Sequence, residues 1–210
     1  MKLINKQELY DYAMKSLVKH YKLNKYQAHA LYMASGKDCI VCEHPLDNKQ
    51  VIKFIRCSKT INFLNLINTI NINTSIVPSK IVHRKENIAI IEQQKIHTIE
   101  KMKPNQVMPY NKLFHLFYNI SLINNKNKLK DAIQPINEYL DSEESAFIPN
   151  RFLLKETINT LVLFCIQHDC IFDLIVANMG FDDNGNLLIF DPISDRPSVI
   201  KNNLSIPTIN

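Results

Sequence analysis

The spacing of hydrophobic and polar residues changes along the chain. Short runs rich in β-branched residues lie mostly in the first half, where they predict strands. Apolar residues at intervals of three and four dominate the second half and predict helices. The predicted helices are residues 6–31, 59–71, 112–122, 129–139 and 151–168, and the predicted strands are residues 39–42, 50–55, 80–83 and 87–91.

A β-hairpin is predicted near the C-terminal end. Residues 179–181 and 187–190 are short apolar runs, and the polar residues between them favour a turn. Gly185 within this turn is free to adopt a positive φ. The hairpin would bring Asn178 and Asp191, which flank it, side by side.

The order of these elements predicts one α+β domain with two lobes. A chain of 210 residues is long enough for two small lobes that share a cleft. The predicted parts are a β-rich N-terminal lobe with its N-terminal helix over residues 1–92, a hinge over 93–96, a helical C-terminal lobe over 97–195 and a tail over 196–210.

Composition narrows the class of protein. The chain is 46% hydrophobic and 21% charged, which is ordinary for a globular protein. Its net charge of +5 comes from scattered Lys and Arg, so we expect no nucleic-acid groove. The longest apolar run, residues 161–166, is too short to cross a membrane, and no signal peptide is evident. Five Cys, an odd number, favour reduced thiols and a cytoplasmic location.

The spacing of three polar residues points to phosphoryl transfer. Asp173, Asn178 and Asp191-Pro192 have the spacing with which protein kinases handle ATP and metal ions. Asp173 is the candidate catalytic base, and Asn178 and Asp191 are candidate Mg²⁺ ligands through oxygen atoms. The plainer interpretation is a capping Asp followed by a polar turn between two strands.

The first half offers matching nucleotide-binding candidates. Lys53 lies in a predicted strand, where a kinase lysine would pair with the phosphates of ATP. Gly36, with Ser35 and Lys37 beside it, is the candidate phosphate-binding turn, and Glu92 lies at the predicted hinge. A single glycine is a weak signal, since an ordinary turn or an exposed edge lysine would look the same. Together these residues predict a minimal two-lobe protein-kinase-like fold.

These motifs resemble the early serine/threonine protein kinases of autographivirus-type podophages. The resemblance is carried by residues 36–53, with His44 and Pro45 between, and by Phe172-Asp173, Asn178 and Asp191-Pro-Ile-Ser194. It implies a small atypical kinase that uses ATP and Mg²⁺ to phosphorylate Ser or Thr of host bacterial proteins early in infection. The functional residues that it implies are Lys53, Asp173, Asn178 and Asp191.

The chain also departs from ordinary kinases. Ile171-Phe172 replaces the His-Arg that usually precedes the catalytic Asp. No Glu lies between Arg56 and Pro78, so the usual partner of the lysine is missing, and Glu86 or Glu92 is the candidate substitute. Few residues follow Asp191, so a truncated activation segment is expected.

Several alternatives stay open. The chain is also consistent with a compact bacterial effector kinase, or with a pseudokinase that serves as a nucleotide- or protein-binding module. An unrelated α+β domain with a fortuitous hairpin is the plainest alternative. Cys39-x-x-Cys42 lacks a second pair at zinc-site spacing, so buried thiols are expected there.

Overall fold

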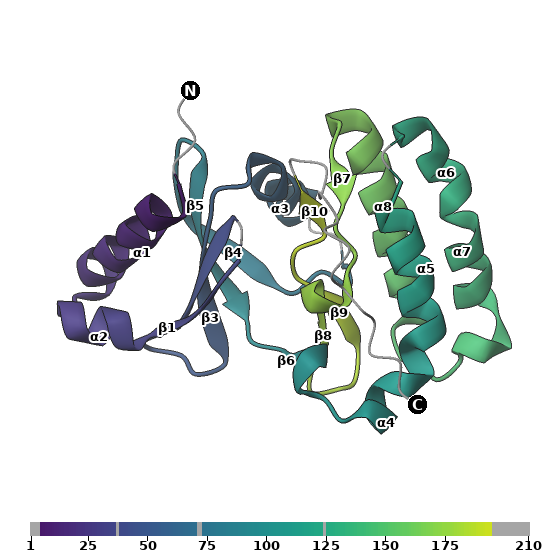
Figure 1. Cartoon of the computed structure of the whole chain (residues 1–210), viewed down its shortest axis with the longest axis horizontal. Helices are drawn as coiled ribbons and strands as arrows, with labels where there is room; N and C mark the ends of the chain where they lie inside the picture. The colour runs from purple at the N-terminus through teal and green to yellow at the C-terminus, as the bar shows by residue number, and fades with distance from the viewer. Residues whose placement is uncertain (1–4, 37, 71–72, 124, 195–210) are drawn as a thin grey trace.

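The computed structural model describes residues 5–36, 38–70, 73–123 and 125–194. Its N-terminal part holds an antiparallel sheet of five strands in the order β1-β2-β3-β5-β4, with two helices before the sheet and a third between β3 and β4 (Figure 1). These elements are α1 (Lys6–Tyr21), α2 (Lys25–Ala30), β1 (Tyr32–Ser35), β2 (Cys39–Glu43), β3 (Gln50–Ile55), α3 (Ser58–Ile70), β4 (Ser79–Lys85) and β5 (Ile88–Gln94).

The single helix expected over residues 6–31 is wrong, because the structure has two helices there. Lys22 follows α1 with a φ of 55°, in the left-handed region that ends helices. Asn24 then caps α2, since its side chain accepts a hydrogen bond from the Gln27 amide. The sequence holds this capping signal inside an unbroken helical pattern.

The sheet separates two hydrophobic cores. On its outer face, α1 packs Leu9, Ala13 and Leu17 against strand residues that include Phe54. Alternate residues of the same strands, among them Ile55, face α3 and the helical part of the chain. Figure 1 shows the sheet standing between α1 and α2 on one side and α3 on the other.

The C-terminal part is mainly helical, as predicted. Helices α5, α7 and α8 pack side by side (Figure 1). The elements are β6 (His97–Thr98), η1 (Ile99–Lys101), α4 (Pro104–Val107), η2 (Met108–Tyr110), α5 (Asn111–Ser121), η3 (Lys126–Lys128), α6 (Leu129–Ala132), α7 (Gln134–Asp141), η4 (Glu143–Ser145), α8 (Arg151–His168), β7 (Ile171–Phe172), η5 (Val176–Asn178), β8 (Met179–Phe181), β9 (Leu187–Ile189) and β10 (Ile193–Ser194).

One predicted helix of this part is divided. Residues 129–139 form α6 and all but the last two residues of α7, with Pro135 in the first turn of α7. Proline has no N–H to donate and is tolerated in a first turn, so it favours a new helix at this point. The helix expected over residues 151–168 is confirmed by α8.

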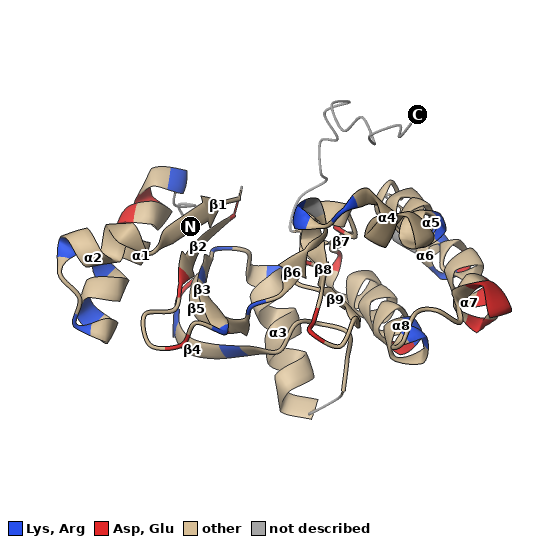
Figure 2. Ribbon diagram, turned by 90° about the horizontal axis from the view of Figure 1, so that it is seen from below, with Lys and Arg blue, Asp and Glu red and all other residues tan. Residues whose placement is uncertain are grey.

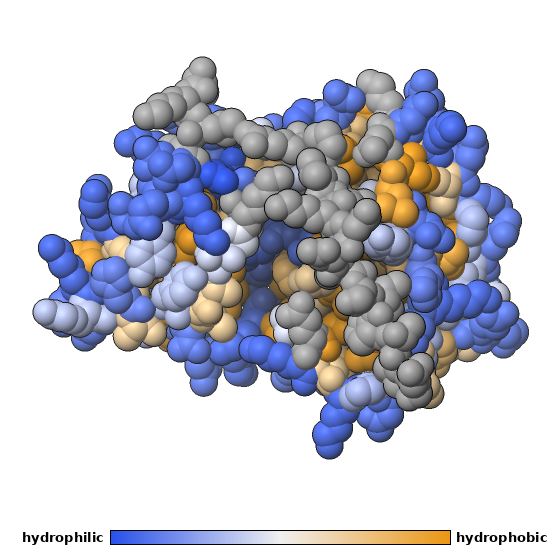
Figure 3. Space-filling view, viewed as in Figure 1, coloured by the Kyte–Doolittle hydropathy of each residue, from blue (hydrophilic) through white to orange (hydrophobic). Residues whose placement is uncertain are grey.

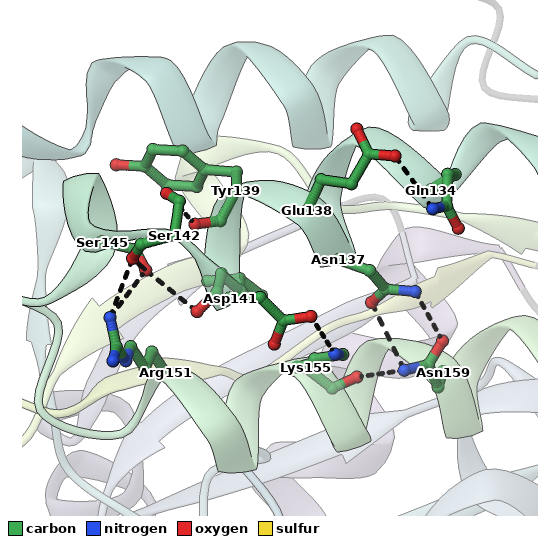
Figure 4. A network of polar contacts seen from close by, with 11 residues as sticks. Gln134, Asn137, Glu138, Tyr139, Asp141, Ser142, Ser145, Arg151, Lys155 and Asn159 are labelled. Atoms are coloured by element: carbon green, nitrogen blue, oxygen red, sulfur yellow. Dashed lines mark hydrogen bonds and ion pairs between the residues drawn. The ribbon is translucent and has the colours of Figure 1, made fainter.

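Polar contacts join α7 to α8 (Figure 4). Lys155 pairs with Asp141, and the amides of Asn137 and Asn159 exchange hydrogen bonds of 3.2 and 3.4 Å. Arg151 donates to the Ser142 carbonyl at 2.9 Å, just beyond the end of α7. These contacts fix how the two helices pack, although each partly exposed pair contributes little stability by itself.

Charged residues are spread over both parts of the molecule (Figure 2). Lys and Arg occur on separate helices and strands, with acidic residues between them, in agreement with the scattered charge of the sequence. Of the helices in the described ranges, none is both long enough and apolar enough to cross a membrane. The chain is thus a mixed α/β protein with a sheet in its N-terminal region and helices in its C-terminal region.

Candidate functional site

A buried lysine and an aspartate from opposite ends of the chain meet in an ion pair. Lys53 lies in β3 opposite Ile91 of β5, so it points to the face of the sheet that packs toward the helical part. Its Nζ is 2.9 Å from Oδ2 of Asp191, 138 residues later in the sequence. The side chain of Lys53 is 3% exposed and that of Asp191 is 24% exposed. The ammonium also lies 5.1 Å from the centre of the Phe190 ring.

The β8–β9 hairpin positions Asp191. The predicted hairpin is confirmed, with Met179 opposite Ile189, and Gly185 in its turn has a φ of 78°. Gly180 lets β6 approach, because a Cβ there would lie 2.6 Å from the His97 carbonyl oxygen. The short strand β6 therefore pairs with β8 and holds the hairpin against the end of the N-terminal part.

Asn178 ties the hairpin to the loop that carries Asp173. Its Nδ2 donates to the Asp173 carbonyl at 2.9 Å and to the Asp191 carbonyl at 3.0 Å. The Asp173 amide donates to the Pro192 carbonyl at 2.9 Å, and the Phe190 amide donates to the Asn178 carbonyl at 3.0 Å. These four hydrogen bonds fix the positions of Asp173, Asn178 and Asp191 relative to one another.

Two polar residues that the sequence did not single out, Ser121 and Asn150, hold the loop of Asp173 and the β8–β9 hairpin in place. Ser121, buried in α5, accepts a hydrogen bond from the Leu174 amide at 3.1 Å, next to Asp173. Asn150 bonds both the N–H and the carbonyl of Leu187 at the start of β9. The sequence gives little indication of these roles. A Ser within a helix or an Asn before one is more often exposed to solvent than buried with a structural role.

The turn between β1 and β2 lies close to the same ion pair. The Gly36 amide donates to the Cys39 carbonyl at 2.9 Å, and a Cβ on Gly36 would lie 3.1 Å from Cys39 Sγ. Ser35 is the last residue of β1, where its hydroxyl accepts a bond from Tyr32 at 3.2 Å. Lys37, the other residue predicted in this turn, lies outside the described residues.

Cys39 is a further neighbour of the ion pair. Burial raises the pKa of its thiol, and the negative charge of Asp191 raises that pKa further, while Lys53 lowers it. Cys42 packs in the other core, between the sheet and α1. The two thiols therefore belong to different faces of β2, and the expectation of buried cysteines is confirmed for Cys42, whereas Cys39 is half-buried.

Glu92 does not pair with Lys53, so this expectation is wrong. It lies opposite Ile52 in the register of β5 with β3 and therefore points to the outer face of the sheet. There its carboxylate accepts a hydrogen bond from Tyr21 at 3.0 Å. Glu86 lies in the exposed turn between β4 and β5, so Asp191 is the acid that pairs with Lys53. The predicted hinge begins inside β5, which runs to Gln94.

The donor set is compatible with Mg²⁺. Within the described residues, no group of three or more His, Cys, Asp or Glu has the geometry to hold a metal ion. Mg²⁺, however, is usually held by one or two protein oxygens together with substrate phosphates. Both hydrogen bonds that the Asn178 side chain makes to described residues are made by Nδ2, to the backbone carbonyls of Asp173 and Asp191, so they do not occupy its Oδ1.

The surface is hollowed near these elements. Figure 3 shows a recess between the β1–β5 sheet and the β8–β9 hairpin, with hydrophilic residues inside it. Asp191 and Lys53 come from the two elements that border this recess. The ammonium of Lys53 and the carboxylate of Asp191 are thus paired between the sheet and the segment that follows the hairpin.

Comparisons with known proteins add a likeness to solved structures. No protein-family model matches the chain. No curated protein matches it either. A solved structure of the gentamicin–APH(2")-IIa complex is similar over 94% of this chain and 73% of that chain, with 16% sequence identity and a TM-score of 0.39. Values this low carry no functional argument, so the geometry of the side chains must carry it.

Proposed function

We propose that this chain is an ATP- and Mg²⁺-dependent phosphotransferase of the protein-kinase class. The observation that carries the proposal is the ion pair between Lys53 of the third strand and Asp191 after the hairpin. A lysine on the third strand and an aspartate on a later loop are the parts that kinases use to hold phosphates and metal. Lys53 and Asp191 are 138 residues apart in the sequence, so their contact supports a shared binding site far better than the sequence spacing alone.

Each residue has a role that fits its environment. Lys53 would pair with the α- and β-phosphates of ATP, because its ammonium is held in place by β3. Asp191 and the Oδ1 of Asn178 would hold Mg²⁺, which when bound neutralises charge on the phosphates. Asp173 would accept the proton of the acceptor hydroxyl. Gly36 and Ser35 would lie over the phosphates without bulky side chains.

The proposed acceptor is a Ser or Thr hydroxyl of a host protein, as the resemblance to the phage kinases implies. A compact effector kinase would use the same chemistry in another host. A pseudokinase is the second candidate, and one observation favours it: α3 holds no acid to orient Lys53, which is paired with the proposed metal ligand instead.

Two measurements on the purified full chain test the proposal. The first is incorporation of labelled γ-phosphate from ATP with Mg²⁺, for wild type, Asp173→Asn and the control Asp131→Asn on the exposed side of α6. We expect Asp173→Asn to reduce transfer by about 10²–10⁴-fold, as for other lost general bases, while Asp131→Asn retains it. The second is thermal unfolding with ATP and Mg²⁺ against ATP with a chelator.

The outcomes separate the candidates. Metal-dependent stabilisation by ATP with transfer lost in Asp173→Asn supports the kinase. The same stabilisation with wild-type transfer equal to that of Asp173→Asn identifies a pseudokinase. Absence of both transfer and stabilisation refutes the nucleotide site altogether.

A further inference from the structure

A second hollow lies on the opposite face of the sheet from Lys53. It has a volume of about 190 Å³ and lies between the C-terminal half of α1 and strands β3 to β5. Phe54 and Ile90 contribute apolar surface, and His20 and Tyr21 of α1 and His83 of β4 add rings to its lining. The rings of His20 and His83 contact each other, with centroids 5.4 Å apart and planes inclined by 45°.

One carboxylate, that of Glu92, also lines this hollow. Its Oε1 accepts a hydrogen bond from Tyr21 at 3.0 Å and lies 3.4 Å from Nε2 of His44. Oε2 has no hydrogen-bond donor among the residues that the structure describes. Burial, with the nearby carboxylate, raises the pKa of Tyr21, so the phenol stays protonated and remains a donor to Oε1.

Among the described residues, no Lys or Arg lies within ion-pair distance of Glu92, although Lys80 of β4 stands opposite it in the register of the sheet. The side chain of Glu92 is 23% exposed, and within the described part of the chain its one ion-pair partner is His44, which carries charge only when protonated. Carboxylates that are largely removed from water are usually paired with Lys or Arg. A half-buried carboxylate on the wall of an aromatic-lined hollow therefore favours a cationic occupant.

We propose that this hollow binds a guanidinium group. A guanidinium is planar and weakly hydrated, so it can stack on ring faces while its N–H groups donate to Oε2 of Glu92. The volume is sufficient, because a cavity of about 150 Å³ already admits a benzene ring. A primary ammonium is a compact, strongly hydrated ion that does not stack, so we expect guanidinium to be preferred over ammonium.

Calorimetric titration of the full chain without nucleotide tests this proposal. The probes are agmatine, its ammonium counterpart putrescine, and the neutral urea Nα-acetylcitrulline amide. The expected order of affinity is agmatine, then putrescine, with no binding of Nα-acetylcitrulline amide. A short peptide with one internal Arg distinguishes the source: tighter binding than agmatine identifies a protein side chain, and weaker binding identifies a free small molecule.

Two variants localise the binding. Glu92→Gln keeps the shape of the side chain and should weaken agmatine at least about tenfold, the loss expected for one charged hydrogen bond. Glu43→Gln is the matched control, since Glu43 lies on β2 of the same sheet and pairs with Lys95 in solvent. His83→Ala, on an exposed stretch of β4, provides a second test if Glu92→Gln fails to fold.

Agmatine affinity that is unchanged in both Glu92→Gln and His83→Ala would overturn the proposal, as would equal affinities for agmatine and Nα-acetylcitrulline amide. These readouts measure binding in the absence of ATP. They would therefore stand or fall separately from the phosphotransferase assignment.

Discussion

The ion pair between Lys53 and Asp191 predicts an asymmetry between two single substitutions. Asp191→Asn leaves the ammonium of Lys53, whose side chain is 3% exposed, buried without a counter-charge. Lys53→Met leaves the carboxylate of Asp191 instead, and its 24% exposure lets water reach it. Met also fills the space of the lysine stem with an apolar chain of similar length. Removal of the acid should therefore cost more stability than removal of the base.

The magnitudes follow from burial. Breaking a buried pair by removing one partner costs about 3–5 kcal/mol, and the partial exposure of Asp191 with the nearby Phe190 ring favours the lower end. We expect about 3 kcal/mol for Asp191→Asn and about 1 kcal/mol for Lys53→Met. At about 2–4 °C per kcal/mol for a chain of this size, Asp191→Asn should lower Tm by roughly 6–12 °C. The double variant should resemble Lys53→Met, which implies a coupling energy of about 3 kcal/mol between the two residues.

Urea unfolding followed by far-UV circular dichroism, without ATP or divalent cations, measures these costs. The chain holds no Trp, so tryptophan fluorescence offers no signal. Two results would refute the reasoning: a cost of Lys53→Met at least equal to that of Asp191→Asn, or a double variant whose cost equals the sum of the two.

Three further predictions concern stability. Gly180→Ala should lower the free energy of unfolding by about 1–3 kcal/mol, because its Cβ would lie 2.6 Å from the His97 carbonyl oxygen. A urea midpoint equal to that of the wild type would contradict this. Asn150→Ala should cost about 1–3 kcal/mol, since it leaves both backbone groups of Leu187 without their partner, and Asn150→Asp should recover part of the loss. Burial raises the pKa of Cys42 from 9.0 to about 12, so the unfolded thiol ionises first above pH 9. Its contribution to stability should fall by about 1.4 kcal/mol per pH unit above pH 9, and Cys42→Ala should flatten that dependence.

Local sequence signals were sufficient for much of the fold. The hairpin was predictable because its two apolar runs and its turn lie within residues 179–190, and Gly185 does adopt the positive φ that the turn needs. Helix α8 was predictable because its pattern is long and has no internal Pro or Gly. In both cases the determining contacts lie close together along the chain.

Long-range contacts determined what the sequence left open. The strands β6, β7 and β10 have two residues each, too few to show an alternating pattern, and exist only through distant partners. The face on which Glu92 lies was also unpredictable, because Ile90 and Ile91 are both buried and β5 shows no alternation of apolar and polar residues. Only the register with β3 reveals that Glu92 and Lys53 face opposite sides of the sheet.

The helix α3 shows how the site keeps its shape without an acid beside Lys53. Oγ1 of Thr60 donates to the Ile193 carbonyl at 3.1 Å, just beyond Asp191. Phe63 packs edge-on against Phe164 of α8, with ring centroids 5.1 Å apart. Both α3 and Lys53 therefore contact the segment around Asp191. Helix α3 does so through the hydrogen bond to the Ile193 carbonyl, and Lys53 through its ion pair with Asp191. An acid on α3 is unnecessary for holding that helix in place, because apolar packing and a backbone bond already fix it against the C-terminal part.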